Sequence, residues 1–220
     1  MRGIAERLAN DGFTVDLPLL PGHGTSLDDM LETRWSDWSG AAEEAYRDLA
    51  ARCEKVVVVG LSMGGTLCCW LAERNPEISG LVVINPMVLP VPEYRAMLQT
   101  TLDSGTTVID AIGSDIAMPD VKEISYKGTP VAPLISFLDG LEEIAERLSE
   151  IRCPVLLLSS RVDHVVPVSS GDLLEEAVSG PCERIWLERS YHVATLDYDR
   201  DEVELRTVDF VTTAVASPGA

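Results

Sequence analysis

The stretch Val56-Val57-Val58-Val59-Gly60-Leu61-Ser62-Met63-Gly64-Gly65 decides the fold of this chain. Its first four residues form an apolar, β-branched run that is typical of a buried strand, and a helix-forming segment follows over residues 66–74. Glycines on both sides of Ser62 let the backbone bend sharply without a clash from Cβ atoms. A strand, a sharp turn with an exposed serine hydroxyl, and a helix are therefore predicted. A glycine-rich turn with an incidental serine is the alternative.

The size and composition of the chain indicate a single globular domain. It has 220 residues, of which 46% are hydrophobic and 24% are charged, and no apolar run is long enough to cross a bilayer. The first residues are amphipathic and include Glu6, so they do not resemble a signal peptide. The five cysteines form no CxxC pair and no metal-binding spacing. We expect a cytoplasmic protein whose cysteines are reduced.

The charge balance narrows the class of ligand. The chain has 17 Lys and Arg residues against 36 Asp and Glu residues, which gives a net charge of -19. A protein that binds nucleic acid or an anionic membrane surface needs a basic face, which this composition does not readily supply. We therefore expect a neutral small molecule as substrate, with no nucleic acid partner and no stable insertion into a membrane.

Strands and helices alternate along the chain. Apolar or alternating runs predict strands at residues 13–17, 56–59, 81–85, 154–159 and 184–187. Helical periodicity predicts helices at residues 1–10, 66–74, 136–151, 170–178, about 200–215, and up to about residue 53 from an N-cap at Ser36 or Asp37. The alternation indicates an α/β fold with a mainly parallel sheet. Residues 86–135, rich in Pro and Gly, interrupt the alternation and are expected to form a cap insertion.

Three histidines are candidates for a base that would activate Ser62. A serine hydroxyl is a poor nucleophile near neutral pH, so it needs an imidazole to accept its proton and a carboxylate to orient that imidazole. His192 follows the last predicted strand, where the order serine, acid, histidine places the base. His23 precedes the serine turn, and His164 lies in a loop next to Asp163. We predict His192 as the base and interpret the other two as loop residues.

Two aspartates compete as the orienting acid. Asp163 lies just beyond the strand predicted at residues 154–159, and catalytic groups of such sheets gather at the carboxyl ends of the strands. Asp197 follows His192 on the same loop, whereas the carboxylate normally comes from another strand. We therefore predict Asp163 as the acid. A turn aspartate ahead of Pro167 is the alternative interpretation of this residue.

With Ser62, Asp163 and His192 in this order, the chain resembles the bacterial carboxylesterases and monoacylglycerol lipases of the α/β-hydrolase superfamily. The resemblance spans nearly the whole chain. Four segments resemble those that flank the reactive residues of this family, namely residues 20–24 (LPGHG), 60–65 (GLSMGG), 161–167 (RVDHVVP) and 190–197 (SYHVATLD).

The resemblance implies hydrolysis of an uncharged carboxylic ester of short or medium acyl length, or of a monoacylglycerol, without a cofactor. Ser62 would attack the ester carbonyl as the nucleophile, His192 would act as general base and then as general acid, and Asp163 would orient His192. The backbone N–H of Met63, directly after the nucleophile, would be one of two donors that stabilise the tetrahedral oxyanion.

The resemblance also implies that part of the family's fold is missing ahead of Met1. Members usually have a strand and a His-Gly loop before the helix with which this chain begins, and that loop provides the second oxyanion donor. The missing strand would lie between the strands predicted at residues 13–17 and 56–59. The single domain, residues 1–220, would then be truncated at its N-terminus. We expect that the working protein is longer and that Met1 is an internal methionine; a real but shortened form, impaired or completed by a partner, is the alternative.

Two other functions are compatible with the sequence. Another serine hydrolase of this fold, such as a thioesterase, a C–C bond hydrolase or a cofactor-free haloperoxidase, would use the same residues. A non-catalytic scaffold that binds a small hydrophobic ligand under the cap is the second, because a missing oxyanion donor would impair catalysis. Serine at position 62 disfavours haloalkane dehalogenases, which need a carboxylate there, and dienelactone hydrolases, which need a thiol.

Overall fold

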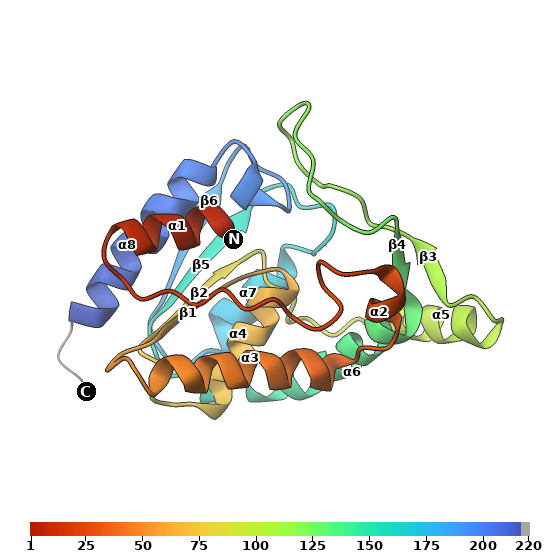
Figure 1. Cartoon of the computed structure of the whole chain (residues 1–220), viewed down its shortest axis with the longest axis horizontal. Helices are drawn as coiled ribbons and strands as arrows, with labels where there is room; N and C mark the ends of the chain where they lie inside the picture. The colour runs from red at the N-terminus through yellow and green to blue at the C-terminus, as the bar shows by residue number, and fades with distance from the viewer. Residues whose placement is uncertain (217–220) are drawn as a thin grey trace.

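The computed structural model describes residues 1–216, and its centre is a four-stranded parallel sheet (Figure 1). In spatial order, its strands are β1 (Val57–Leu61), β2 (Gly80–Ile84), β5 (Val155–Ser160) and β6 (Cys182–Leu187). Every residue of β2 and β5 is buried, because helices cover both faces of the sheet and neither side of these strands meets water. The predicted α/β fold with a parallel sheet is confirmed.

Two layers of helices cover the sheet, and each has its own apolar core (Figure 1). One layer consists of α3 (Trp35–Ala50), α4 (Met63–Arg74), α6 (Val131–Arg147) and α7 (Ser169–Ala177). The other consists of α1 (Arg2–Asn10) and α8 (Arg200–Ala216), and two short 3-10 helices, η1 (Leu148–Glu150) and η2 (Ala194–Leu196), lie in the connections. In the part of the chain that the structure describes, no helix has both the length and the apolar character needed to span a bilayer.

The chain between β2 and α6 folds outside the sheet, and we call residues 86–130 the cap segment. It contains α5 (Pro92–Asp103) and an antiparallel pair of short strands, β3 (Val108–Asp110) and β4 (Gly128–Pro130). The loop between β3 and β4 projects from the body of the molecule, and α2 (Leu27–Leu31) packs against α6 and β4 (Figure 1). The helix predicted to begin at residue 136 begins at Val131 instead, since Pro133 is tolerated in a first turn, where the N–H is not needed.

The strand predicted at residues 13–17 is wrong. The segment is extended beside the sheet but forms no strand. Within the described chain, no backbone hydrogen bond is donated by Thr14, Val15, Asp16 or Leu17 to another backbone carbonyl. A strand is defined by its ladder of hydrogen bonds, and this segment has no neighbour at ladder distance. The alternation of apolar and polar residues reflects the position of this segment against an apolar surface, and it does not indicate that the segment belongs to the sheet.

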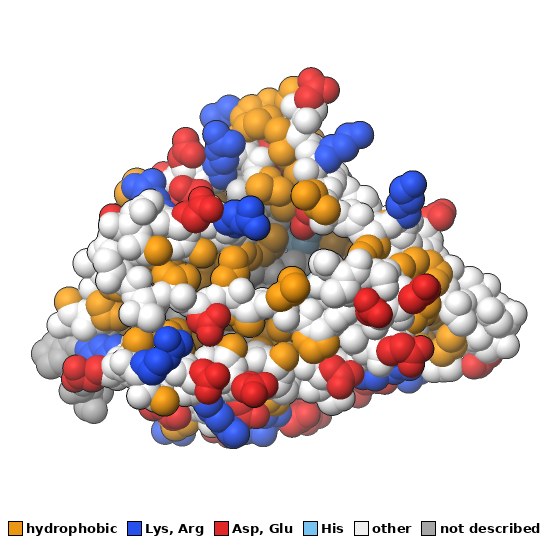
Figure 2. Space-filling view, in the orientation of Figure 1, with side chains coloured by type: hydrophobic (Ala, Val, Ile, Leu, Met, Phe, Trp, Pro, Cys, Tyr) orange, Lys and Arg blue, Asp and Glu red, His pale blue; other side chains and the backbone are white. Residues whose placement is uncertain are grey.

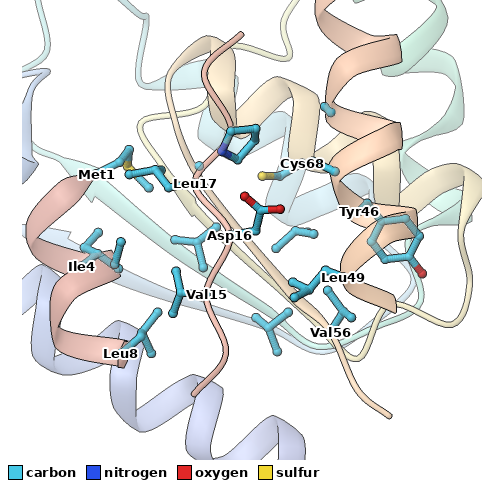
Figure 3. Close-up of a pocket in the computed structure, with 18 of the residues that line it drawn as sticks. Met1, Ile4, Leu8, Val15, Asp16, Leu17, Tyr46, Leu49, Val56 and Cys68 are labelled. Carbon is cyan, nitrogen blue, oxygen red and sulfur yellow. The ribbon is translucent and has the colours of Figure 1, made fainter. Parts of the chain in front are cut away.

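A groove separates this extended segment from β1, which is the edge strand of the described sheet, and we call it the β1 groove (Figure 3). Its volume is about 320 Å³, and its lining is mainly apolar. Both helix layers contribute to the lining, including Ile4 and Leu8 of α1 and Tyr46 and Leu49 of α3. The groove therefore passes between the two layers, at the place where the sequence analysis expected a missing strand.

The backbone of β1 is paired on one side only. The N–H of Ser62 donates to the carbonyl of Ile84 at the end of β2, at 2.9 Å. Because backbone groups of successive strand residues point to alternate sides in the plane of the sheet, those of Val57, Val59 and Leu61 point away from β2 and toward the β1 groove.

The N-terminus of α3 differs slightly from the prediction. Neither Ser36 nor Asp37 is the N-cap residue, because Arg34 occupies that position and the helix begins at Trp35. Asp37 instead accepts a hydrogen bond from the N–H of Arg34, at 2.7 Å. A carboxylate three residues into a helix can satisfy the N-cap amide in this way, as part of a capping box.

Candidate active site

Ser62 occupies a strained turn between β1 and α4. Its φ and ψ angles are 54° and -122°, and such a backbone costs a residue with a side chain about 1 to 3 kcal/mol. A Cβ atom at position 60 would collide with the backbone of Gly64, and one at position 65 would lie 3.0 Å from the Cβ of Pro86. Glycine at positions 60 and 65 therefore makes the turn possible, and the turn holds Ser62 at the carboxyl end of β1.

Asp163 and His192 form a hydrogen-bonded pair. His192 Nδ1 lies 2.7 Å from Asp163 Oδ2, and the two side chains are 8% and 4% exposed. Asp163 Oδ1 accepts hydrogen bonds from the N–H groups of Val165 and Val166, each at 2.8 Å. Both carboxylate oxygens are thus held in place. A carboxylate at Nδ1 favours the tautomer in which Nδ1 carries the proton and Nε2 accepts one.

Ser62, Asp163 and His192 lie at the same edge of the sheet. Ser62 follows β1, Asp163 follows β5 and His192 follows β6. Because these strands are parallel, their carboxyl ends meet at one edge, which is where such sheets bind ligands. Figure 2 shows a histidine side chain at the bottom of a hollow on one face of the molecule, with hydrophobic side chains around it. All three residues thus follow strands at the edge of the sheet where a ligand would bind.

Two buried polar residues that the sequence analysis did not single out hold the loop of His192. Asn85 Nδ2 donates to the carbonyl oxygen of His192, and Ser160 Oγ donates to that of Tyr191, each at 2.8 Å. The N–H of Ser160 also donates to Asn85 Oδ1 at 2.8 Å. Asn85 directly follows β2 and Ser160 ends β5. A polar residue at the carboxyl end of a continuous apolar strand is the sequence signal that could have identified both.

Asp197, the rival carboxylate, is fully buried and is bound to backbone amides. Its two oxygens accept hydrogen bonds of 2.6 to 2.9 Å from the N–H groups of Ala117, Met118, Tyr191 and Tyr198. These four N–H donors occupy the roughly four lone-pair sites at which a carboxylate accepts hydrogen bonds. The structure thus brings Asp163 to the ring of His192 and uses Asp197 to join the cap segment to the loop of His192.

The other residues named from the sequence lie around this centre. Met63 is the first residue of α4, so its N–H is among the first four of the helix, which have no acceptor within it. His164 Nδ1 lies 2.8 Å from Asp115 Oδ1, and its side chain is 57% exposed. His23 Nδ1 lies 3.2 Å from the carbonyl oxygen of Pro21, and its ring meets that of Trp38 edge to face. Both histidines lie in loops.

Metal-binding side chains and thiols are the other candidates for a reactive group at this site. Among the described residues, no group of three or more His, Cys, Asp or Glu side chains could hold a metal ion. All five cysteines are free. Burial raises the pKa of the Cys68 thiol to about 12 and the pKa values of Cys153 and Cys182 to about 11. Because the thiolate is the nucleophilic form, these cysteines act as packing residues near neutral pH.

Comparisons with known proteins identify the family. A family model described as serine aminopeptidase, S33, matches residues 1–199. Over 211 residues, the chain is 43% identical to the thermostable monoacylglycerol lipase of Bacillus sp. (strain H-257), and the match covers 96% of this chain and 84% of that protein. The chain is an α/β-hydrolase. This α/β-hydrolase is also 25% identical to the carboxylesterase of Bacillus subtilis (strain 168), across 96% of its own length and 86% of that protein.

Solved structures agree with this assignment. The α/β-hydrolase superposes with a TM-score of 0.92 on a structure from work on the metagenome-derived lipolytic enzymes LipS and LipT, with 37% identity over 96% of this chain and 87% of that one. The monoacylglycerol lipase of Paleococcus ferrophilus shares the fold, with a TM-score of 0.76 and 18% identity over 96% of this chain and 88% of that one. The α/β-hydrolase therefore belongs with the esterases and lipases of its superfamily.

Proposed function

We propose that this α/β-hydrolase is a serine esterase in which Ser62, His192 and Asp163 hydrolyse an uncharged carboxylic ester of short or medium acyl length, or a monoacylglycerol. The 2.7 Å hydrogen bond between His192 Nδ1 and Asp163 Oδ2 carries the proposal, because it favours an imidazole whose Nε2 can accept the proton of Ser62. The strained backbone of Ser62 and its position at the same sheet edge support the assignment of the nucleophile.

The reaction would proceed through an acyl-enzyme. Ser62 Oγ attacks the ester carbonyl while His192 Nε2 accepts its proton, and the resulting oxyanion accepts a hydrogen bond from the N–H of Met63. The tetrahedral intermediate then expels the alcohol, which takes its proton from His192. A water molecule that transfers a proton to His192 attacks the acyl-enzyme and releases the carboxylic acid. Asp163 stabilises the imidazolium that forms in each stage.

The relatives and the charge of the chain support the substrate class. The 43% identical Bacillus protein is named a monoacylglycerol lipase, and the 25% identical Bacillus subtilis protein is named a carboxylesterase. A net charge of -19 disfavours polyanionic acyl donors such as coenzyme A thioesters. The hydrophobic side chains around the hollow in Figure 2 suit an acyl chain. A neutral ester therefore fits better than a charged thioester.

We also propose that the β1 groove holds a further parallel strand in the working protein, contributed by polypeptide upstream of Met1. Such a strand would pair with the backbone of Val57, Val59 and Leu61, and its side chains would enter the apolar layers on both sides of the groove. Met1, at the start of α1, also lines the groove (Figure 3). A loop after the strand would supply the second oxyanion donor.

Hydrolysis of p-nitrophenyl butyrate tests the esterase proposal. We expect Ser62→Ala to lower kcat by at least about 10³-fold, because the nucleophile is lost. The matched control is Ser36→Ala, which changes an exposed serine of α3 and should leave kcat unchanged. Labelling by a fluorophosphonate probe should require Ser62. Activity of Ser62→Ala equal to that of the unmodified chain would refute the assignment of the nucleophile.

A ligand-binding scaffold is the second candidate, and the β1 groove is the observation that favours it. The groove lies where the strand that leads to the second oxyanion donor is expected, and loss of one such donor typically lowers turnover about 10²-fold to 10³-fold. If neither this chain nor a version extended upstream exceeds the background of Ser62→Ala, and no probe labels Ser62, the scaffold becomes the better account.

A further inference from the structure

A carboxylate of the cap segment joins the two loops that hold Asp163 and His192. Asp115, in the loop between β3 and β4, accepts hydrogen bonds through Oδ2 from the N–H groups of His164 and His192, each at 3.1 Å. Its Oδ1 lies 2.8 Å from His164 Nδ1, and its backbone carbonyl accepts a hydrogen bond from the N–H of Val193 at 3.1 Å. One cap residue thus contacts the neighbour of the acid and the base itself.

A carboxylate in the loop of His192 accepts hydrogen bonds from the backbone of the cap segment. Asp197 Oδ2 accepts from the N–H groups of Ala117 and Tyr191, at 2.6 and 2.9 Å, and Oδ1 accepts from that of Met118 at 2.9 Å. The cap segment and the loop of His192 therefore each supply one aspartate to the backbone of the other. Hydrogen bonds with an ionised acceptor are roughly twice as strong as those between neutral groups, so this double connection is well suited to fix the loop.

The backbone of His192 is held at both of its polar groups. Asp115 accepts its N–H from the cap segment, and Asn85 donates to its carbonyl oxygen from the end of β2. The ring of His192 is fixed separately, by Asp163. With the backbone and the ring fixed together, Nε2 can point in only a narrow range of directions.

Asp115 is held in its charged form. Its side chain is 14% exposed, and this burial by itself favours the neutral acid. The hydrogen bonds from the backbone and ring of His164 and from the backbone of His192 outweigh the burial, so the pKa of Asp115 is lowered overall. The acceptor that the two N–H groups need is therefore ionised at neutral pH.

We propose that Asp115 is a positioning residue of the active site, which sets the location of His192 through its backbone N–H and ties that location to the acid loop through His164. The inference rests on the proposed function, because the consequence is drawn for the Ser62, His192 and Asp163 mechanism. It gives one residue of the cap segment, Asp115, a role in positioning the catalytic base.

Three variants test this role. Asp115→Ala removes both side-chain acceptors, and we expect a fall in kcat for p-nitrophenyl butyrate of about 10-fold to 100-fold, because small displacements of a catalytic group cost this much. Asp115→Asn keeps an oxygen that can accept the N–H of His192, so it should recover most of the lost rate. Asp110→Ala changes an exposed aspartate of β3 in the same cap segment and should match the unmodified chain. KM should stay within about threefold in all three variants, since substrate binding is not altered.

Two further measurements separate positioning from folding and from the proposed function itself. Thermal unfolding compares the stability of the variants, and proton NMR follows the imidazole N–H of His192 that is hydrogen-bonded to Asp163. We expect this signal to shift or broaden in Asp115→Ala and to return in Asp115→Asn. An unchanged kcat and an unchanged signal in Asp115→Ala would overturn the inference, as would a loss of rate that tracks lowered stability and is not recovered in Asp115→Asn. Failure of both the unmodified chain and a version extended upstream of Met1 to exceed the Ser62→Ala background would instead contradict the proposed function, while the NMR comparison would still decide the positioning role.

Discussion

Asp163, Asp115 and Asp197 lie in one small region, and the atoms that they contact give them different functions. Asp163 bonds the ring of His192, whereas Asp115 and Asp197 accept hydrogen bonds mainly from backbone amides. Residue type alone does not distinguish an orienting acid from an anchor. The order of residues along the chain favoured Asp163, and the structure places that side chain at the ring.

The different contacts of Asp163 and Asp197 predict different effects when each residue is replaced by Asn. Asp163→Asn should lower kcat by about 10⁴-fold with little change in stability, because the amide presents a donor or a weaker acceptor to Nδ1 and favours the wrong tautomer. Asp197→Asn should chiefly lower the free energy of unfolding, by about 1 to 3 kcal/mol, because buried amides lose a charged acceptor. Steady-state kinetics and thermal unfolding of both variants check this. A kcat for Asp163→Asn within tenfold of the unmodified chain would contradict the orienting role.

At the residue scale, a local sequence motif does not reveal contacts between residues that lie far apart along the chain. Ser62, Asp163 and His192 were predicted because a local motif and their order along the chain point to them. Asp115 was not found, because its partners His164 and His192 lie 49 and 77 residues further along the chain. Nothing in the residues next to Asp115 indicates those contacts, which depend on how the cap segment lies over the sheet.

At the scale of elements, the buried strands were the most predictable and the extended segment the least. β2 and β5 are short continuous apolar runs, which are typical of strands covered on both faces. Residues 13–17 show the alternation of a strand, yet whether they pair depends on a neighbour that the local pattern does not specify. The ends of some helices differed from the prediction by a few residues. At the start of α3, for example, the backbone N–H of Arg34 donates to Asp37, and residue type alone does not reveal a cap that depends on a backbone amide.

Helix α4 contains a buried carboxylate that should make stability depend on pH. Burial raises the pKa of Glu73 from 4.5 to about 7, although the guanidinium of Arg74 opposes the shift. Glu73 Oε1 also has no hydrogen-bond partner within the described structure. The native state therefore binds more protons than the unfolded chain between these two pH values. This contribution to stability is complete below pH 4.5 and is lost as the pH rises through about 7.

Glu73→Gln should remove this dependence. The unmodified chain should lose up to about 1.4 kcal/mol of unfolding free energy per pH unit across that window from this group, and the variant should show a flatter profile. Urea unfolding at a series of pH values measures the slope. Glu143→Gln is the matched control, because Glu143 pairs with the same Arg74 but is 59% exposed. Identical slopes in the unmodified chain and Glu73→Gln would show that Glu73 titrates normally.

At the scale of the whole molecule, the two helix layers extend beyond β1, an edge strand of the described sheet, and leave the β1 groove between them. The layers that face each other across the β1 groove include α1 and α8 on one side and α3 and α4 on the other, and Figure 3 shows apolar side chains from α1 and α3 pointing into the space between them. A strand at this place would be covered on both faces, as β2 and β5 are. The apolar lining on both sides of the groove thus supports the proposal that a strand fills it in the working protein.

Amide hydrogen exchange tests whether a strand fills the groove. In this chain we expect the amides of Val57, Val59 and Leu61, which point away from β2, to exchange faster than those of Val58 and Gly60, which point toward it. In a version extended upstream of Met1, the three fast amides should become protected to the level of the other two, and p-nitrophenyl butyrate turnover should rise by about 10²-fold or more as the second oxyanion donor is restored. Protection of these amides without a gain in turnover would place the donor elsewhere. Exchange that is unchanged by the extension would contradict the proposal that a strand fills the β1 groove.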